Sequence, residues 1–185
     1  MAYFKAFDPN VEVSGGHLAA FVKAFPAGTE EIGMKMLTAA GLGNPDPNGW
    51  YSLQALLDVM KDLQESFNPG LLTRMGYQVA RLVDLPPDWD DIEVALLGLD
   101  KGYQMNHRGG RIGSYSCEDL GTQNGLRRMK MTVKTHWPCE YELGIIQGAS
   151  ERFKRNGAEV NVREDDSAPC RKNGSDACTF LISWG

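Results

Sequence analysis

The last third of the chain places one apolar repeat of helical spacing between two segments whose apolar residues alternate. The first alternating segment contains Met129, Met131, Val133 and Trp137. The helical spacing joins Leu143, Ile145, Ile146, Ala149 and Phe153. The second alternating segment contains Val160, Val162, Phe180, Ile182 and Trp184. Alternation is typical of half-buried strands, so this part predicts strand, helix, strand, hairpin and strand, with the helix lying on the sheet.

The earlier part of the chain predicts helices. Apolar periodicity with Gly and Pro stop signals predicts helices over residues 17–25, 29–41, 52–67, 71–85 and 92–105, after a short strand or extended arm near residues 11–13. Helices followed by strands favour an α+β fold, in which an N-terminal helical layer packs on a C-terminal antiparallel sheet with one helix inserted between strands. A length of 185 residues with 42% hydrophobic content predicts a single domain, residues 1–185.

Composition excludes several classes of partner. The net charge is -5, and the Lys and Arg residues are scattered, which argues against a nucleic-acid-binding surface. The sequence has no long apolar run that predicts a membrane span, and its first residues lack the layout of a secretory signal. We therefore expect a cytoplasmic protein whose four cysteines are free thiols or metal ligands rather than two disulfides.

Three of the four cysteines fall in the predicted strand–helix–strand unit. Cys139 opens the helix, and Cys170 and Cys178 flank a Gly-containing turn before the last strand. Thiolates at such positions suit a tetrahedral zinc site. The candidates for a fourth ligand are Asp166, Asp165 and Cys117. The alternative is that the cysteines are small buried apolar residues.

His107 follows the last predicted helix, in an Asn-His-Arg-Gly-Gly turn. It can cap the helix, or form with Arg108 an anion-holding turn, or act with Arg108 as the acid and clamp of an enzyme on a carbonyl or phosphate substrate. His17 begins an apolar helix and His136 lies on the Lys-bearing side of its strand. Neither has an acid and a nucleophile in register, so the sequence does not predict a hydrolytic triad.

A helix that opens with Cys139 and contains GIIQG, followed by C-x7-C and a TFLISW strand, resembles the vinyl-4-reductase domains. The haem nitric-oxide-binding domains and the TRAPP vesicle-tethering subunits belong to the same superfamily. The resemblance implies a cavity between helices and sheet that holds a small apolar molecule. It also implies a His or Glu metal ligand three residues before the middle cysteine, where this chain has Ser167.

In the haem-binding relatives, a histidine of the last helix before the sheet ligates iron and a Tyr-x-Ser-x-Arg strand motif holds the propionates. This chain has His107 beyond the predicted helix, and its strand reads TVKTHWPC without that motif. The resemblance therefore favours an apolar ligand over haem and keeps a haem-binding gas sensor as the alternative.

The resulting prediction is a sensor or carrier domain that signals through a partner protein or a homodimer, with zinc as its candidate metal. The predicted ligand-binding residues are Tyr77, Tyr103, Met105, His107, Arg108 and Trp137. The predicted metal ligands are Cys139, Cys170, Cys178 and Asp166. No dinucleotide fingerprint is present, so a binding module is favoured over an enzyme.

Overall fold

The structure is a computed structural model that describes residues 3–66, 70–155 and 157–185. The helices of the first part are α1 (Gly15–Lys23), α2 (Glu30–Ala39), α3 (Leu53–Ser66), α4 (Gly70–Leu82) and α5 (Ile92–Met105). The C-terminal part consists of β4 (Ser114–Gln123), β5 (Leu126–Lys134), α6 (Cys139–Phe153), β6 (Val160–Glu164), the short 3-10 helix η1 (Arg171–Asn173) and β7 (Cys178–Trp184). The α+β prediction is confirmed.

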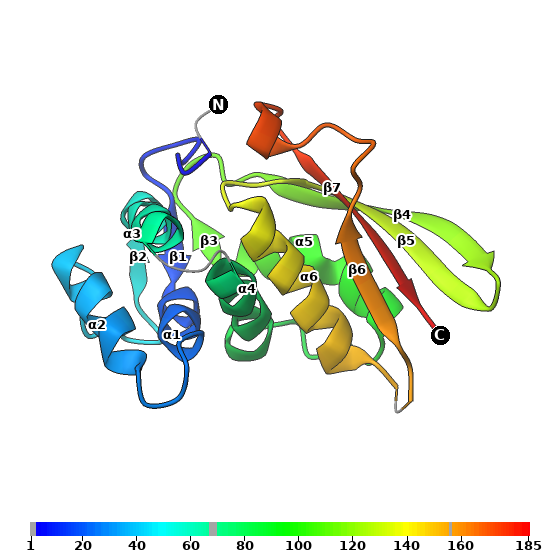
Figure 1. Ribbon diagram of the computed structural model, residues 1–185, viewed down its shortest axis with the longest axis horizontal. Coiled ribbons are helices and arrows are strands. Elements are labelled where there is room, and N and C mark those ends of the chain that lie inside the picture. Colours follow the sequence, from blue (N-terminus) through cyan, green and yellow to red (C-terminus); the bar gives the residue numbers. More distant parts are fainter. Residues whose placement is uncertain (1–2, 67–69, 156) are drawn as a thin grey trace.

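The main sheet is antiparallel, with strand order β4-β5-β7-β6. The inserted helix α6 joins β5 to β6, as the sequence predicts. The alternating residues Met129, Met131 and Val133 of β5 are buried, and so are Phe180 and Ile182 of β7. The sheet lies on one side of the molecule, with α5 and α6 against it and α1 to α3 farther away (Figure 1).

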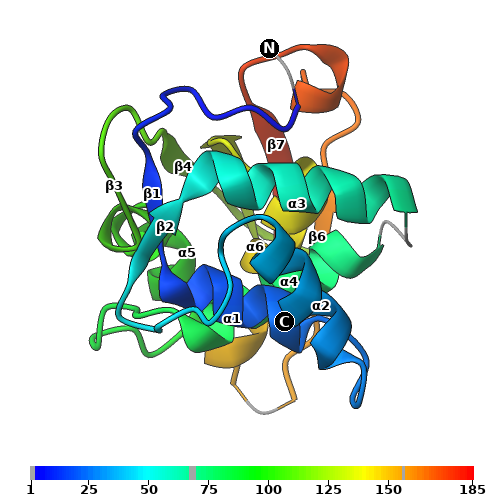
Figure 2. The ribbon, with the colours of Figure 1, turned by 90° about the vertical axis from the view of Figure 1, so that its left-hand side faces the viewer.

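A second sheet was not predicted. The short strands β1 (Glu12–Ser14), β2 (Trp50–Ser52) and β3 (His107–Arg108) form an antiparallel sheet in the order β2-β1-β3. Val13 pairs with both Tyr51 and His107. Figure 2 shows this sheet beside α1 and α5. It ties the start of the chain to the residues that follow α5.

Helices α4 and α6 cross at glycines. A Cβ atom at Gly76 would lie 1.9 Å from Tyr141 O, and one at Gly144 would lie 2.0 Å from Thr73 O. At Gly148 it would lie 2.6 Å from Tyr77 O. Since such distances are shorter than any van der Waals contact, only glycine allows the two backbones to pack this closely.

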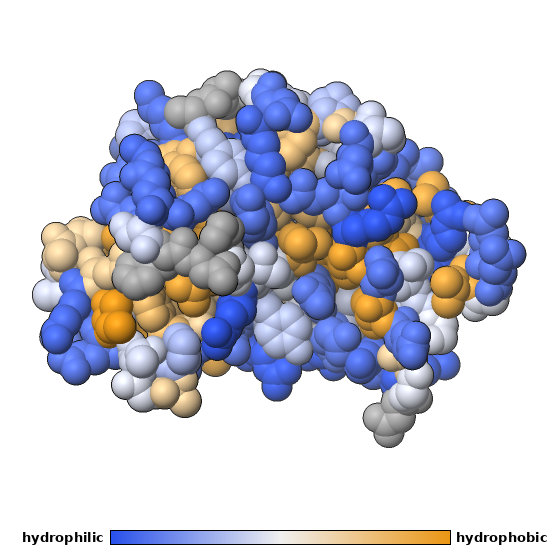
Figure 3. Space-filling model, in the orientation of Figure 1, coloured by the Kyte–Doolittle hydropathy of each residue, from blue (hydrophilic) through white to orange (hydrophobic). Residues whose placement is uncertain are grey.

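The predicted helix boundaries agree with the structure to within a few residues, and Phe67 lies outside the described part of the chain. His107 lies in β3, directly after the C-cap residue Asn106 of α5. Its Nδ1 donates to Tyr103 O in the last turn of α5, so the predicted capping of the helix is confirmed. Within the described residues, no helix combines the length and the apolar character that crossing a bilayer requires. Apolar residues on the face in Figure 3 form separate patches among hydrophilic ones.

Candidate functional site

A cavity lies where α1, α4, α5, α6 and β4 meet. Its volume is about 30 Å³ and its wall is almost entirely apolar. The titratable side chains that line it are His17, Tyr103, His107 and Tyr115. Leu99, Val79 and Ile145 are among the apolar ones. The cavity lies between the helical layer and the sheet, where the sequence predicts a ligand site, but it is smaller than an aromatic effector or an acyl chain requires.

His107 presents a nitrogen without a hydrogen-bond partner. Its Nδ1 lies 2.8 Å from Tyr103 O. A carbonyl oxygen only accepts, so Nδ1 carries the proton and Nε2 keeps a free lone pair. Nε2 is buried and has no hydrogen-bond partner within the described residues. Burial lowers the pKa of His107 well below its ordinary value, with a smaller contribution from His17, so the ring is neutral.

His17, near the start of α1, has the same tautomer. Its Nδ1 lies 3.3 Å from Ser14 Oγ. The single Ser14 hydroxyl proton is donated to Asn106 Oδ1 at 2.8 Å, so Ser14 Oγ must accept from His17 Nδ1. Nε2 of His17 is therefore also unprotonated. Burial lowers the pKa of His17 to about 3.

The two imidazoles lie side by side and belong to one aromatic cluster. Their ring centroids are 5.0 Å apart with an interplanar angle of 77°. Trp137, fully buried, stacks on His17 at 5.3 Å and meets His107 edge-on at 5.6 Å. Trp137 thus fixes the plane of the His17 ring.

Asn106 connects the elements that carry the two histidines. Its side-chain amide donates to Asp84 O and to Gly102 O, each at 2.9 Å. Its backbone carbonyl accepts from Ser14 N at 3.0 Å. Since both amide protons have acceptors, Oδ1 must be the atom that faces Ser14.

A buried carboxyl group lies behind the cavity. Glu142 of α6 accepts hydrogen bonds from the hydroxyls of Tyr115 and Thr135. Burial raises the pKa of Glu142 to about 7, while those two hydrogen bonds and the charge of Arg171 act in the opposite direction. Tyr115 therefore lines the cavity with its ring and contacts an acid that titrates near neutral pH.

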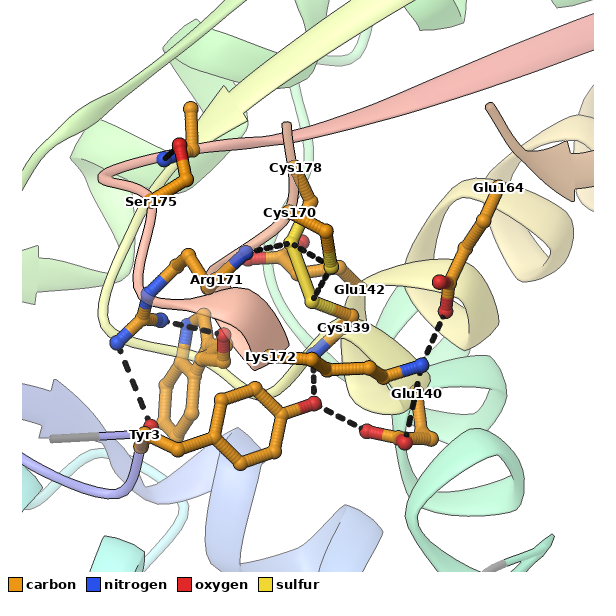
Figure 4. Close-up of a disulfide and its surroundings, with 12 residues drawn as sticks. Tyr3, Cys139, Glu140, Glu142, Glu164, Cys170, Arg171, Lys172, Ser175 and Cys178 are labelled. Carbon is orange, nitrogen blue, oxygen red and sulfur yellow. Dashed lines mark hydrogen bonds and ion pairs between the residues drawn. A yellow bond between two sulfur atoms is a disulfide. The ribbon is translucent and has the colours of Figure 1, made fainter. Parts of the chain in front are cut away.

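Three sulfur atoms converge at the start of α6, as the sequence predicts. The sulfur atoms of Cys139, Cys170 and Cys178 lie within 4.8 Å of one another (Figure 4). Cys170 Sγ is 3.2 Å from Cys139 Sγ and 3.4 Å from Cys178 Sγ. Arg171 packs beside them and donates to Trp137 O at 2.7 Å and to Tyr3 O at 3.3 Å. The cluster thus joins the chain start, α6 and the β6–β7 connection.

The bonding of the cluster differs from the prediction. Cys139 and Cys178 form a disulfide, whereas we expected free thiols or metal ligands. That expectation was wrong for this pair because long-range packing brings the two side chains together. Asp166 is exposed and lines a neighbouring hollow with Cys170 and Cys178, outside the three-sulfur group. Cys117 contacts Met129 Sδ at 3.9 Å instead of joining the group.

The remaining predicted ligand residues lie in different places. Tyr103 lines the cavity with His107. Tyr77 is partly buried on α4, where Arg81 lies over its ring at 6.0 Å. Met105 is 46% exposed. Arg108 pairs with Glu12 at 2.7 Å and lies over the Trp50 ring at 4.5 Å, so it points away from the cavity.

Sequence reasoning did not select Tyr115 or Glu142, and it dismissed His17. Glu142 lies on the buried side of α6, where a carboxyl group is unusual, and that position was its only signal. His17 stood next to apolar residues of its helix, and its partner His107 is 90 residues away in the sequence.

Comparison with known proteins agrees on the fold. The chain matches the H-NOX protein of S. oneidensis in its Fe(II) ligation state with a TM-score of 0.67 and 14% identity, over 93% of this chain and 96% of that one. It matches the Fe(II) unliganded H-NOX protein of K. algicida with a TM-score of 0.61 and 14% identity, over 93% and 96%. A mutant of the T. Tengcongensis H-NOX protein gives 0.59 and 13%, over 92% and 96%.

The chain has the H-NOX fold. No protein-family model and no curated protein matches the sequence. The resemblance to the haem nitric-oxide-binding domains is thus supported at the level of fold, whereas the resemblance to vinyl-4-reductase domains and TRAPP subunits stays a prediction.

The raised pKa of Glu142 predicts a pH-dependent stability. Between about pH 4.5 and 7, folded Glu142 holds a proton that the unfolded chain has lost, so the free energy of unfolding falls as pH rises through this window. One pKa unit corresponds to about 1.4 kcal/mol, so the wild type should lose roughly 2–3 kcal/mol relative to Glu142→Gln between pH 5 and 8. Urea unfolding at both pH values measures this.

The exposed Glu65 provides the matched control, because Glu65→Gln should leave the pH dependence of the wild type unchanged. Identical pH dependence in the wild type and Glu142→Gln would show that Glu142 titrates normally.

Proposed function

We propose that this chain is a sensor domain that binds a gas-sized molecule in the cavity between His17 and His107. The observation that carries the proposal is a buried imidazole nitrogen, His107 Nε2, without a partner among the described residues, in a residue that lines an apolar cavity of about 30 Å³. Holding one water requires roughly 10–15 Å³ by the same measure, so the cavity has room for about two waters or one diatomic molecule. Few polar groups compete with such a ligand.

Similar structures supply independent support. Solved structures with this fold include the S. oneidensis H-NOX protein in its Fe(II)NO and Fe(II)CO ligation states. Another similar structure concerns haem redox potential and porphyrin distortion by the protein. These proteins bind small gases, and gas sensing is the function that we carry over to this chain as a proposal.

Haem is the cofactor that the fold implies, and the residues present fit it only in part. The donor fits, because His107 Nδ1 donates to a carbonyl and Nε2 is free to bind a metal. The space does not fit, because side chains fill the region around a cavity of about 30 Å³ and the two imidazoles are 5.0 Å apart. The chain also lacks the Tyr-x-Ser-x-Arg motif. No step of the proposed function therefore involves haem.

Ligand binding has a direct route to the rest of the molecule. His17 belongs to α1 and His107 to β3, and the Ser14–Asn106 hydrogen bonds join these elements. A molecule in the cavity would contact His17 of α1 and Tyr103 of α5 and would thereby change the position of α1 relative to α5. A partner protein or a second copy of the chain would read this change, consistent with population shift between two packings.

The direct test is gas binding followed by NMR of alanine methyl groups. Xenon or CO added to the metal-free protein should shift the methyl signals of Ala80 and Ala149, which line the cavity, in a saturable manner. Ala55 of α3 and Ala168 after β6 neither line this cavity nor belong to α1 or α5, so their signals serve as internal controls. Unchanged cavity signals, or equal shifts at all four alanines, would refute the proposal. A Soret band in protein purified from its native host would show that the chain binds haem and would refute gas binding to a haem-free cavity.

The three-sulfur cluster favours a second role. After reduction of the Cys139–Cys178 disulfide, three thiolates at mutual distances below 4.8 Å can hold one zinc ion, with Asp166 or a water as the fourth ligand. Such a site would be structural or redox-sensitive, because zinc binding and disulfide formation exclude each other.

Metal analysis of the reduced protein tests this role. We expect one zinc per chain in the wild type and at least a tenfold lower zinc affinity in Cys170→Ser. Cys117→Ser is the control, because burial raises the pKa of the Cys117 thiol to about 11 and Cys117 lies outside the cluster. Absence of zinc from the reduced wild type, or equal zinc affinity in Cys170→Ser, would exclude the site.

A further inference from the structure

We propose that His17 Nε2 and His107 Nε2 together ligate one transition-metal ion, without a porphyrin, and that the cavity between them provides its open coordination positions. The inference rests on the proposed gas-binding function and names the centre to which the gas binds. Copper in its Cu(I) state is the ion that the surroundings favour.

The two nitrogens meet the chemical requirement for metal ligands. A metal binds the unprotonated nitrogen of a neutral imidazole. Tyr103 O and Ser14 Oγ each accept from an Nδ1, which leaves both Nε2 lone pairs available. Both rings line the same cavity and are nearly fully buried. His107 Nε2 is buried and has no hydrogen-bond partner within the described residues, and a metal ion would satisfy it.

The spacing of the rings fits a shared ion. Metal–imidazole bonds measure about 2.0–2.1 Å, so two imidazoles on a tetrahedral ion have ring centres roughly 5 Å apart. The centroids of His17 and His107 are 5.0 Å apart. Two tetrahedral positions then remain for ligands from the cavity of about 30 Å³, which has room for one diatomic molecule.

The backbone holds the two ligands in place before any metal arrives. Val13 of β1 pairs with His107 of β3, and α1 with His17 begins directly after β1. Tyr103 O and Ser14 Oγ accept the two Nδ1 protons, and hydrogen bonds of this kind fix the orientation of metal-binding histidines. The Ser14 hydroxyl is itself oriented by Asn106, the residue before His107.

The charge of the surroundings selects the ion. Both imidazoles are neutral, and the wall of the cavity is almost entirely apolar. The nearby carboxyl group, Glu142, is occupied by Tyr115 and Thr135. A divalent ion would add two uncompensated charges to this interior, whereas Cu(I) adds one, and imidazole is a good ligand for copper.

The experiment uses the complete chain, ¹⁵N-labelled at histidine, metal-free and with its disulfide intact, titrated anaerobically with Cu(I). Cu(I) is diamagnetic, so NMR reports each histidine separately even where sulfur atoms also take up copper. We expect the Nε2 signals of His17 and His107 to shift together with one copper ion. His136 is the internal control, since its Nδ1 accepts from Phe7 N at 2.8 Å and its Nε2 therefore carries the proton.

Two variants refine the test. His17→Ala should remain folded by circular dichroism and abolish the shift at His107, whereas Ser14→Ala should weaken copper binding about 10–100-fold while both histidines still respond. A response of only one histidine, no response at either, or haem uptake by the wild type overturns the inference. Gas binding to the metal-free cavity without copper binding would refute the metal site and leave the proposed function standing. Copper binding without any gas binding would refute the proposed function and leave the metal site standing.

Discussion

The buried amide of Asn106 is the interaction on which the site depends. With three hydrogen bonds it joins the residues after α4, the last turn of α5 and the strand before α1. These segments come from different parts of the chain. The first two contribute to the wall of one cavity, and the third leads into α1, which contributes His17. Both N–H groups of the amide already have acceptors, so Asn106 Oδ1 faces Ser14 and accepts the hydroxyl proton. Ser14 Oγ must then accept from His17 Nδ1, which sets the tautomer of His17. A single side chain thus connects the packing of the helical layer to the chemistry of the imidazole pair.

Titratable groups lie in and behind the largely apolar wall of the cavity, and they are neutral. Burial lowers the pKa of both imidazoles and raises that of Glu142, so all three groups favour their uncharged forms. Such groups are costly in a core unless they have partners. Glu142 has two, whereas His107 Nε2 has none within the described residues. His136 Nε2 and Trp137 Nε1 are also buried without a partner in the described part of the chain, but His107 lines the cavity, and this distinguishes the cavity from an ordinary packing defect.

Local patterns explain what the sequence could predict. Alternation along β5 and β7 and the apolar stripe of α6 lie within short windows, so the sheet and its inserted helix were predicted correctly. The convergence of Cys139, Cys170 and Cys178 followed because all three belong to that one unit. A short strand or extended arm was predicted near β1, but β1 and β3 have only 3 and 2 residues, too few to indicate that they pair across nearly a hundred residues of sequence. The sequence therefore missed the sheet that brings His17 to His107.

The H-NOX fold positions a cavity between helices and sheet, but the side chains in this chain decide what the cavity accepts. The central claim is that both imidazoles are neutral and keep an unprotonated Nε2 toward the same space. Histidine ¹⁵N spectra of the metal-free protein, recorded from pH 8 to 5, test it most directly. We predict a protonated Nδ1 and an unprotonated Nε2 for His17 and His107 throughout this range. A proton on either Nε2, or titration of either ring near its ordinary pKa of about 6.5, would contradict the account.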